Sequence, residues 1–454
     1  MGPEVSRTDR FHIEETNDRR SPFQRDRDRI LHTRAFRRLG SVTQVVHADE
    51  GMNYHNRLTH SLKVAQIGQR LAEYLIEDAD EDTIQKAGGL SPDVVEAAAL
   101  AHDLGHPPFG HAAEEELMIQ TAAKGLIGGF EGNPQSFRIV NKVATHSSDY
   151  RGLDLTYATL NAILKYPWTR GSAGPERTKW GTYHTEREIF EEVRKLPTPG
   201  PDDQGQSLEA CIMDWADDIA YAIHDMSDFY KAGLIPLEQL IRDSSEREVF
   251  VKAFGEKYDT PKNWDPEKFL EENILKTGEI AASGGENPFK SSFSNKPENR
   301  GTLNFMTSEL IRRYLGLNKD TEVFVDPSIN GGLYITESLK HEIKLLKFLT
   351  EYYVFQDPTL VAQQRGQRKI IEELFTTLYK ASEKGAEYNE IIPEPFCSML
   401  NQDVYEADLD DSTSKETRAR IVADLIASLS ESQAVDLYQR VSGENPGSVT
   451  ESIL

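Results

Sequence analysis

AHDLGHPPFGHAAE, residues 101–114, is the stretch that guides the interpretation of the whole chain. It gathers three histidines, an aspartate and a glutamate around a break made by glycine and proline. Upstream, Ser91 and Pro92 supply a cap residue and a first-turn proline for a helix that this break ends. The adjacent His102 and Asp103 are therefore expected at a helix end, where an imidazole nitrogen and a carboxylate oxygen together suit a divalent metal.

A second predicted helix offers a further ligand. Residues 57–76 carry apolar side chains at spacings of three and four, which predicts an amphipathic helix. His60 follows Arg57 by three residues, so the two share one face and could present a metal ligand beside a phosphate-binding cation. A surface pair is the alternative interpretation.

A third predicted helix, at about 208–231, carries an acidic stripe. Asp217, Tyr221 and Asp225 are spaced by four residues and lie on one face of an otherwise apolar helix. Buried acids are costly without a cation or a hydrogen-bonding ligand. An exposed acidic face is the alternative, but the apolar flanks favour burial.

Helical patterning dominates the rest of the chain and predicts a mainly α fold. Further helices are expected in three ranges: 338–355, 364–381 and 416–440. A small β-hairpin is expected at 322–336, with its turn at Asn330, Gly331 and Gly332.

Composition limits the class of protein. The chain has 454 residues and a formal net charge of −24, which argues against nonspecific coating of nucleic acid. An anionic ligand would need a local basic pocket, for which the arginine-rich residues 25–38 are one source; a solvated face with salt bridges is the alternative. The sequence has no apolar signal core, no run that could span a bilayer, and two distant cysteines, so a cytoplasmic location is expected.

The ordered pattern of His60, the pair His102 and Asp103, and then Asp217 resembles the HD-domain superfamily of metal-dependent phosphohydrolases. The similarity extends to the deoxyguanosine triphosphate triphosphohydrolase (dGTPase) family. Six blocks carry it in the family's order: 21–45, 56–68, 100–114, 128–139, 164–168 and 216–228. The C-terminal YYVFQDPTLVAQQRGQRKIIEELFTTLY is also similar, although less distinctive.

The resemblance implies a mainly α protein with an HD-domain helical core, additional C-terminal helices and the small hairpin. We expect a catalytic core at 1–235 with a loop-rich insertion at 166–206, and an irregular connecting segment at 236–301. A C-terminal helical region would occupy 302–454. The sequence leaves open whether this region packs with the core as one unit.

By the same resemblance, the metal ligands would be His60, His102, Asp103 and Asp217, with Asp218 as the alternative to Asp217. The metal would be Mn²⁺, Mg²⁺ or another transition metal. Family members release tripolyphosphate from a deoxynucleoside triphosphate, and dGTP is the expected preferred substrate. His111 and Glu114 match the family's catalytic pair, and the sequence does not assign the proton transfers between them.

The remaining site residues implied by the resemblance bind the substrate. Phosphate contacts would come from Arg57, Lys165 and Lys179. The positions that match the family's sugar contacts are Gln44, Val45, Tyr221 and Asp225, and His106 and His146 are further active-site candidates. No motif identifies residues that read the base.

The resemblance also implies a homo-oligomer and a nucleotide activator, to whose site residues 25–38 would contribute. A membrane partner is not expected, and binding of single-stranded nucleic acid is left open. Two alternatives remain for the function: an HD-domain phosphohydrolase that acts on another nucleotide, and a noncatalytic nucleotide-sensing or single-strand-binding module.

Overall fold

A computed structural model gives the structure of the chain. It describes residues 5–12, 17–44, 55–172, 174, 177–202, 204–261, 264–275, 280, 289, 291–317, 322–355, 357–407 and 409–445. The prediction of a mainly α fold is confirmed, because one two-stranded sheet is the only sheet among these residues. Among the same residues, no helix combines the length and the apolar character that crossing a membrane requires.

Three helices form the centre of the molecule: α3 (Arg57–Asp78), α5 (Pro92–Ala101) and α10 (Leu208–Lys231). The Asn56 side chain caps α3 and the Ser207 side chain caps α10, which fixes where each helix begins. Both helices match their predicted ranges closely. The helices α3 and α5 pack tightly, since a Cβ on Gly68 would lie 2.9 Å from Val95. The central helices therefore hold the predicted ligands on rigid, buried elements.

The first half of the chain surrounds these three helices with seven further α-helices among the described residues. They are α1 (Pro22–Leu31), α2 (Arg34–Arg38), α4 (Glu81–Lys86), α6 (His111–Ala123), α7 (Gly132–Arg138), α8 (Tyr157–Ile163) and α9 (Arg187–Val193). The loop-rich stretch expected at 166–206 has little regular structure beyond α9 in its described residues. It passes close to the hairpin, because Gly200 N donates to Pro327 O at 3.0 Å.

The segment 236–301 is not irregular in its described part, so this prediction is wrong there. It contains α11 (Leu237–Arg242), α12 (Ser244–Lys257), α13 (Pro266–Phe269) and the start of α15 (Pro297–Tyr314). Phe250 and Phe254 are fully buried and pack on Phe348. These two rings are the main apolar anchors of α12, so the surrounding polar residues obscured its periodicity. Residues 262–263, 276–279, 281–288 and 290 of the segment lie outside the described residues.

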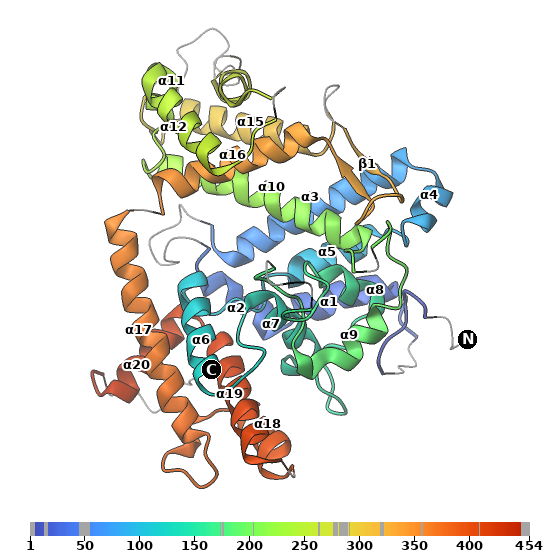
Figure 1. The fold of residues 1–454 in the computed structure, drawn as a ribbon, viewed down its shortest axis with the longest axis vertical. Coiled ribbons are helices and arrows are strands. Elements are labelled where there is room, and N and C mark those ends of the chain that lie inside the picture. Colours follow the sequence, from blue (N-terminus) through green and yellow to red (C-terminus); the bar gives the residue numbers. More distant parts are fainter. Residues whose placement is uncertain are drawn as a thin grey trace.

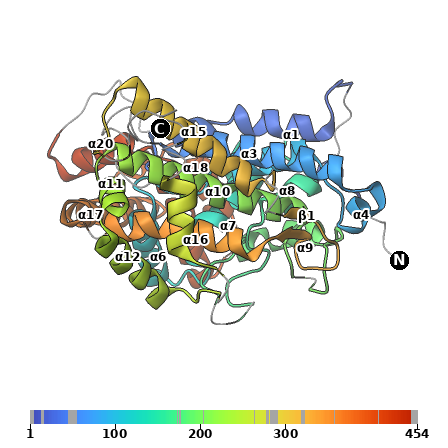
Figure 2. The same ribbon diagram turned by 90° about the horizontal axis from the view of Figure 1, so that it is seen from above.

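The small hairpin is confirmed, with β1 (Val323–Val325) antiparallel to β2 (Leu333–Ile335). Val323 lies opposite Ile335, and the turn between the strands uses positive φ angles at Gly331 and Gly332. After the hairpin, α16 (Glu337–Tyr353) joins α15 against α10, as Figures 1 and 2 show. These elements share one apolar core with the central helices.

A second core is built from the last helices of the chain. It contains α17 (Pro358–Ala381), α18 (Phe396–Leu400), α19 (Asp411–Ala427) and α20 (Glu431–Ser442), of which α17 and α19 pack against α6. The single helix expected at 416–440 is wrong, because Ser430 and Gln433 form a capping box that starts α20 as a separate helix. The region 302–454 is thus divided between two cores.

A buried ion network joins the second core to the first. Asp424 on α19 accepts hydrogen bonds from Arg138 Nε and Nη2 at 2.9 and 2.8 Å, and from Gln135 Nε2 at 2.8 Å. Arg138 also donates to Glu186 at 2.6 Å. All four side chains are nearly inaccessible to solvent. The C-terminal helices are therefore fixed to α7, directly beside the 101–114 turn.

Removal of Asp424 should destabilise the protein strongly. We expect Asp424→Ala to lower the free energy of unfolding by about 3–5 kcal/mol, because the buried Arg138 loses a partner. Chemical denaturation checks this, with Asp436→Ala, an exposed acid on α20, as the control expected to change stability by less than about 0.5 kcal/mol. Equal stability of the two variants would contradict the role given to Asp424.

Candidate active site

The turn after α5 is held in place by its contact with α7. A Cβ on Gly105 would lie 2.1 Å from Gly132 O and 2.3 Å from Ser136 N, so only glycine allows this approach. Ser136 Oγ donates to His102 O at 2.7 Å and accepts from Gly105 N at 2.9 Å. The backbone that carries His102 and Asp103 is consequently fixed on both sides of the helix end.

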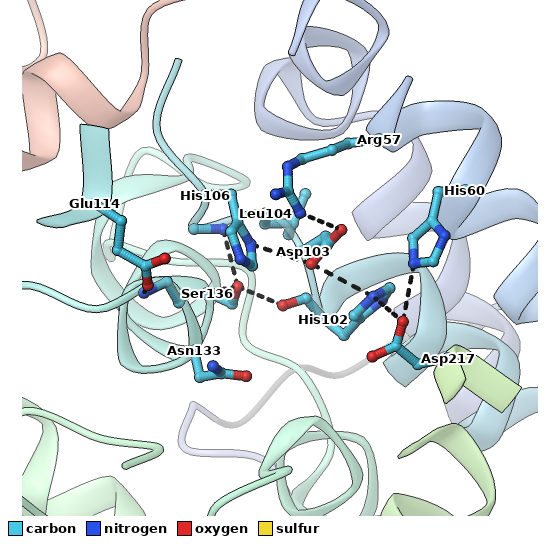
Figure 3. A network of polar contacts seen from close by, with 12 residues as sticks. Arg57, His60, His102, Asp103, Leu104, His106, Glu114, Asn133, Ser136 and Asp217 are labelled. Carbon is cyan, nitrogen blue, oxygen red and sulfur yellow. Dashed lines mark hydrogen bonds and ion pairs between the residues drawn. The ribbon is translucent and has the colours of Figure 1, made fainter. Parts of the chain in front are cut away.

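The four predicted metal ligands converge from α3, the end of α5 and α10 (Figure 3). His60 Nε2 lies 2.9 Å from Asp217 Oδ1, and His102 Nε2 lies 3.7 Å from the same oxygen. His102 Nε2 is also 3.5 Å from Asp103 Oδ1. The potential ligand atoms of His60, His102 and Asp103 all lie within 4.8 Å of one another.

The protonation of His102 fits a metal site. Its Nδ1 lies 2.6 Å from Ala99 O, so Nδ1 donates its proton there and leaves the lone pair of Nε2 free. His102 Nε2 is buried and has no hydrogen-bond partner in the described structure. An imidazole lone pair aimed at two carboxylates is a poor arrangement without a cation, so these residues fit a divalent metal.

Asp217 and Asp218 face different partners in the structure. Asp217 faces both histidines, whereas Asp218 pairs with Lys347 of α16. Burial alone would raise the pKa of Asp217, but Lys165 and the two histidines hold it well below its ordinary value. Asp217 is therefore ionised and directed at the site.

Asp103 is the most enclosed carboxylate of the group. Its Oδ2 accepts a hydrogen bond from Arg57 Nη1 at 2.8 Å, and its Oδ1 lies 3.1 Å from His106 Nδ1. Burial would raise the pKa of Asp103, but above all the charge of Arg57, with His102 and His106 beside it, keeps it well below its usual range. Arg57 thus faces the same site as the metal ligands, and its Nε is held by Thr43 O at 3.0 Å.

His111 and Glu114 form the predicted pair on the first turn of α6. His111 Nδ1 lies 2.7 Å from Glu114 Oε2, and Glu114 Oε1 accepts from Gly132 N at 2.6 Å. Burial would raise the pKa of Glu114, but His111, the charge of His106 and the Gly132 amide together lower it. Because the His111 side chain is 64% exposed, its second nitrogen is accessible to a ligand.

One cavity of about 330 Å³ connects these groups. Of the predicted site residues, its lining includes Gln44, Arg57, His60, His102, Asp103, His106, His111, Lys165, Lys179, Asp217 and Tyr221. Lys165 Nζ lies 2.7 Å from both Asp214 Oδ1 and Asp217 Oδ2, so this cation is already paired.

Four predicted residues are not in the described lining of this cavity: Glu114, which contacts the lining residue His111, and Asp225, His146 and Val45. Asp225 is buried one helical turn after Tyr221, and its Oδ2 has no hydrogen-bond partner among the described residues. The structure does not bring His146 into the cavity; it lines a separate one with Arg20 and Arg29. Val45 lies outside the described residues.

The sequence did not predict the far end of the cavity. Residues from α17 and the turn before it line this end: Phe355, Leu360, Gln363, Gln364 and Gln367. None of them belongs to a metal or catalytic motif. Two signals were available: the spacing of Gln363 and Gln367 by one helical turn, and the resemblance of the stretch 352–379 to the family. Asn133 and Tyr166 also line the cavity and were not predicted, although both lie within the blocks of family resemblance.

The arginine-rich segment 25–38 is largely used for structure. Arg29 donates to the carbonyls of Leu153 and Asp154 at 2.7 Å, and Arg27 pairs with Glu96. Arg34 and Arg37 are exposed beside a second cavity of about 320 Å³. The salt-bridge alternative for this segment therefore accounts for part of it.

The helical fold and the His and Asp cluster define an HD-domain phosphohydrolase, and comparison with known proteins agrees. The HD domain matches residues 57–222, and the phosphohydrolase-associated domain matches residues 333–440. The chain belongs to the family of deoxyguanosinetriphosphate triphosphohydrolase-like proteins.

Two relatives of that name are similar over nearly the whole chain. The protein of Corynebacterium efficiens is 36% identical over 94% of this chain and 92% of its own length. That of Streptomyces coelicolor is 34% identical over 93% of both chains. A relative from Caulobacter vibrioides is 43% identical over 53% of this chain and 54% of its own length.

Metal binding should be measurable without substrate. At a free Mn²⁺ concentration about 100-fold above Kd, the metal should stabilise the wild-type protein by about 2.7 kcal/mol. We expect His102→Ala to weaken binding by more than about 10-fold, since loss of even an outer-shell contact has effects of that size. A thermal shift titration checks this, with the exposed His184→Ala as control. An unchanged Mn²⁺ response in His102→Ala would exclude this cluster as the site.

Proposed function

We propose that this protein hydrolyses deoxynucleoside triphosphates to deoxynucleoside and tripolyphosphate, with Mn²⁺ or Mg²⁺ as cofactor and dGTP as preferred substrate. One observation carries the proposal. A single cavity joins a His and Asp cluster that could hold a divalent metal, His111 with Glu114 behind it, and three cations: Arg57, Lys165 and Lys179. The names of the relatives support the same substrate class.

The reaction requires a water oxygen to attack the α-phosphorus while the bond to the 5′ oxygen breaks. A metal held by the cluster would neutralise charge on the α-phosphate and acidify water. His111 has its Nδ1 engaged by Glu114, which leaves Nε2 for proton transfer at the water or the 5′ oxygen. Arg57 and the two lysines would bind the triphosphate.

Sugar and base recognition follow from the other walls of the cavity. The ring of Tyr221 lines the cavity, and Lys347 Nζ lies 5.5 Å from its centre. We propose that this ring excludes a 2′-hydroxyl and that Gln44 binds the 3′-hydroxyl, since Asp225 is buried and does not line the cavity. The glutamines of α17 would meet the base, with amides that both donate and accept hydrogen bonds.

The alternative of a noncatalytic nucleotide sensor is less well supported. A binding module has no need for a histidine whose tautomer is fixed by a buried glutamate. An HD-domain phosphohydrolase for another nucleotide would share the metal cluster, and the three cations favour a polyphosphate substrate. A homo-oligomer and a nucleotide activator remain predictions from the family.

The reaction type is tested by its products and by His111→Ala. With Mn²⁺ and dGTP, the wild-type protein should release tripolyphosphate, and each of the four deoxynucleoside triphosphates tested in turn gives the base preference. His111→Ala should lower kcat by about 10²–10⁴-fold while dGTP binding is kept. Release of phosphate or pyrophosphate alone would refute the proposed reaction, and undiminished turnover by the variant would remove His111 from it.

Deoxyribose selection is tested at Tyr221. Tyr221→Ala opens space beside the sugar, so the ratio of kcat/KM for dGTP over GTP should fall by about 10-fold or more, the size expected when a shaped pocket loses one contact. Tyr221→Phe keeps the ring and should keep the ratio. Steady-state kinetics with both nucleotides measure it, and an unaltered ratio in Tyr221→Ala would show that another group excludes the 2′-hydroxyl.

A further inference from the structure

We propose that Glu431, in the first turn of α20, is a positioning residue that holds two walls of the active-site cavity together. The inference rests on the proposed function for its kinetic consequences. Glu431 is 3% exposed, and its Oε1 accepts hydrogen bonds from Thr43 N at 2.7 Å and from Phe109 N at 3.2 Å. One carboxylate oxygen of α20 therefore meets two backbone segments that lie far from it in the sequence.

The first of these walls, at Thr43, contacts Arg57. Thr43 and Gln44 line the cavity, and Thr43 O accepts from Arg57 Nε at 3.0 Å. Arg57 in turn donates to Asp103 Oδ2 at 2.8 Å. Because Glu431 fixes the peptide N–H of Thr43, it also restrains the carbonyl that orients the guanidinium group.

The second wall, at Phe109, directly precedes His111 in the sequence. Phe109 and Gly110 have φ angles of +67° and +57°, a conformation that is unfavourable for the phenylalanine. Such a backbone is kept only when its surroundings restrain it, and the bond from Phe109 N to Glu431 is one such restraint. The next residue is His111, which starts α6, and Gly110 O accepts from Glu114 N at 3.1 Å.

A buried cation holds the same turn from another side. Arg38 Nη2 donates to Leu104 O and His106 O, both at 2.8 Å, and Arg38 Nη1 donates to Leu429 O at 3.1 Å. The residues around the start of α20 thus contact the 101–111 turn both through Arg38 and directly through Glu431.

The contacts of Glu431 are not needed to start its own helix. Ser430 and Gln433 form the capping box of α20, and each accepts or donates its hydrogen bonds within the helix end. Glu431 instead bonds to residues 388 and 322 positions away in the sequence. Its role is therefore separable from the stability of α20.

The test compares three Glu431 variants of the full-length protein with one control variant. Glu431→Ala removes the carboxylate that accepts both hydrogen bonds, and Glu431→Asp keeps the charge on a shorter side chain. Both variants should lower kcat for dGTP by about 10- to 100-fold, as expected when reacting groups move by about 1 Å. Glu431→Gln keeps an acceptor oxygen and should stay within about 3-fold of wild type. Leu437→Ala removes a buried side chain elsewhere on α20 and is the control for destabilisation alone.

Amide hydrogen exchange gives a readout that does not depend on turnover. Glu431→Ala and Glu431→Asp should speed exchange in the peptides that contain Thr43 and Phe109, whereas Leu437→Ala should leave these peptides protected. Exchange at the wild-type rate in Glu431→Ala and Glu431→Asp would overturn the inference. A loss of kcat in Leu437→Ala as large as in these two variants would also overturn it. Absence of tripolyphosphate release by the wild type would refute the proposed function and leave the exchange result to decide the role of Glu431.

Discussion

The buried ion pair between Asp103 and Arg57 is the interaction on which the site depends. Each charge would be costly alone in the interior, and their 2.8 Å contact compensates both. Because Asp103 is at the end of α5 and Arg57 at the start of α3, the pair fixes the relative position of these two helices. That position brings His60 of α3 and His102 of α5 toward the same point on α10. The positions of the ligands thus follow from the ion pair that joins the end of α5 to the start of α3.

The C-terminal helices of the second core supply contacts that complete the cavity and hold its loops. The helix α17 supplies the far wall of the cavity, α19 binds Arg138 through Asp424, and α20 reaches Thr43 and Phe109 through Glu431. All of these contacts are made by residues beyond 355. A fragment that ended near residue 235 would keep the ligands but would lack the groups that hold the surrounding loops. The match of the phosphohydrolase-associated domain to residues 333–440 covers most of these contacts.

Features that depend on neighbouring residues could be predicted from the sequence, whereas features that depend on contacts between distant residues could not. The helices at 57–76 and 208–231 were predictable because their apolar periodicity is long and continuous, and the spacing of Asp217 and Tyr221 placed both on one face. The helix α12 was missed because its burial depends on two phenylalanines among polar residues. The break before α20 was missed because serine can continue a helix as well as cap one. The contacts of Glu431 and of the α17 glutamines join residues hundreds of positions apart, and no local pattern encodes such pairings.

Under the proposed function, the placement of the site residues also explains why no sequence motif identifies the residues that bind the base. Groups that would act on the phosphates and the sugar lie on α3, α6 and α10 and in the turn after α5, where buried charges and close packing restrict each position to few residue types. The opposite end of the cavity is lined by α17, of which residues 358–370 include none that is fully buried. Packing places little restriction on such a helix face, so glutamines there can be exchanged without loss of the fold. Under the proposed function, the groups for the chemistry common to all deoxynucleoside triphosphates therefore lie on closely packed elements, while discrimination among bases is left to a helix face that packing does not constrain.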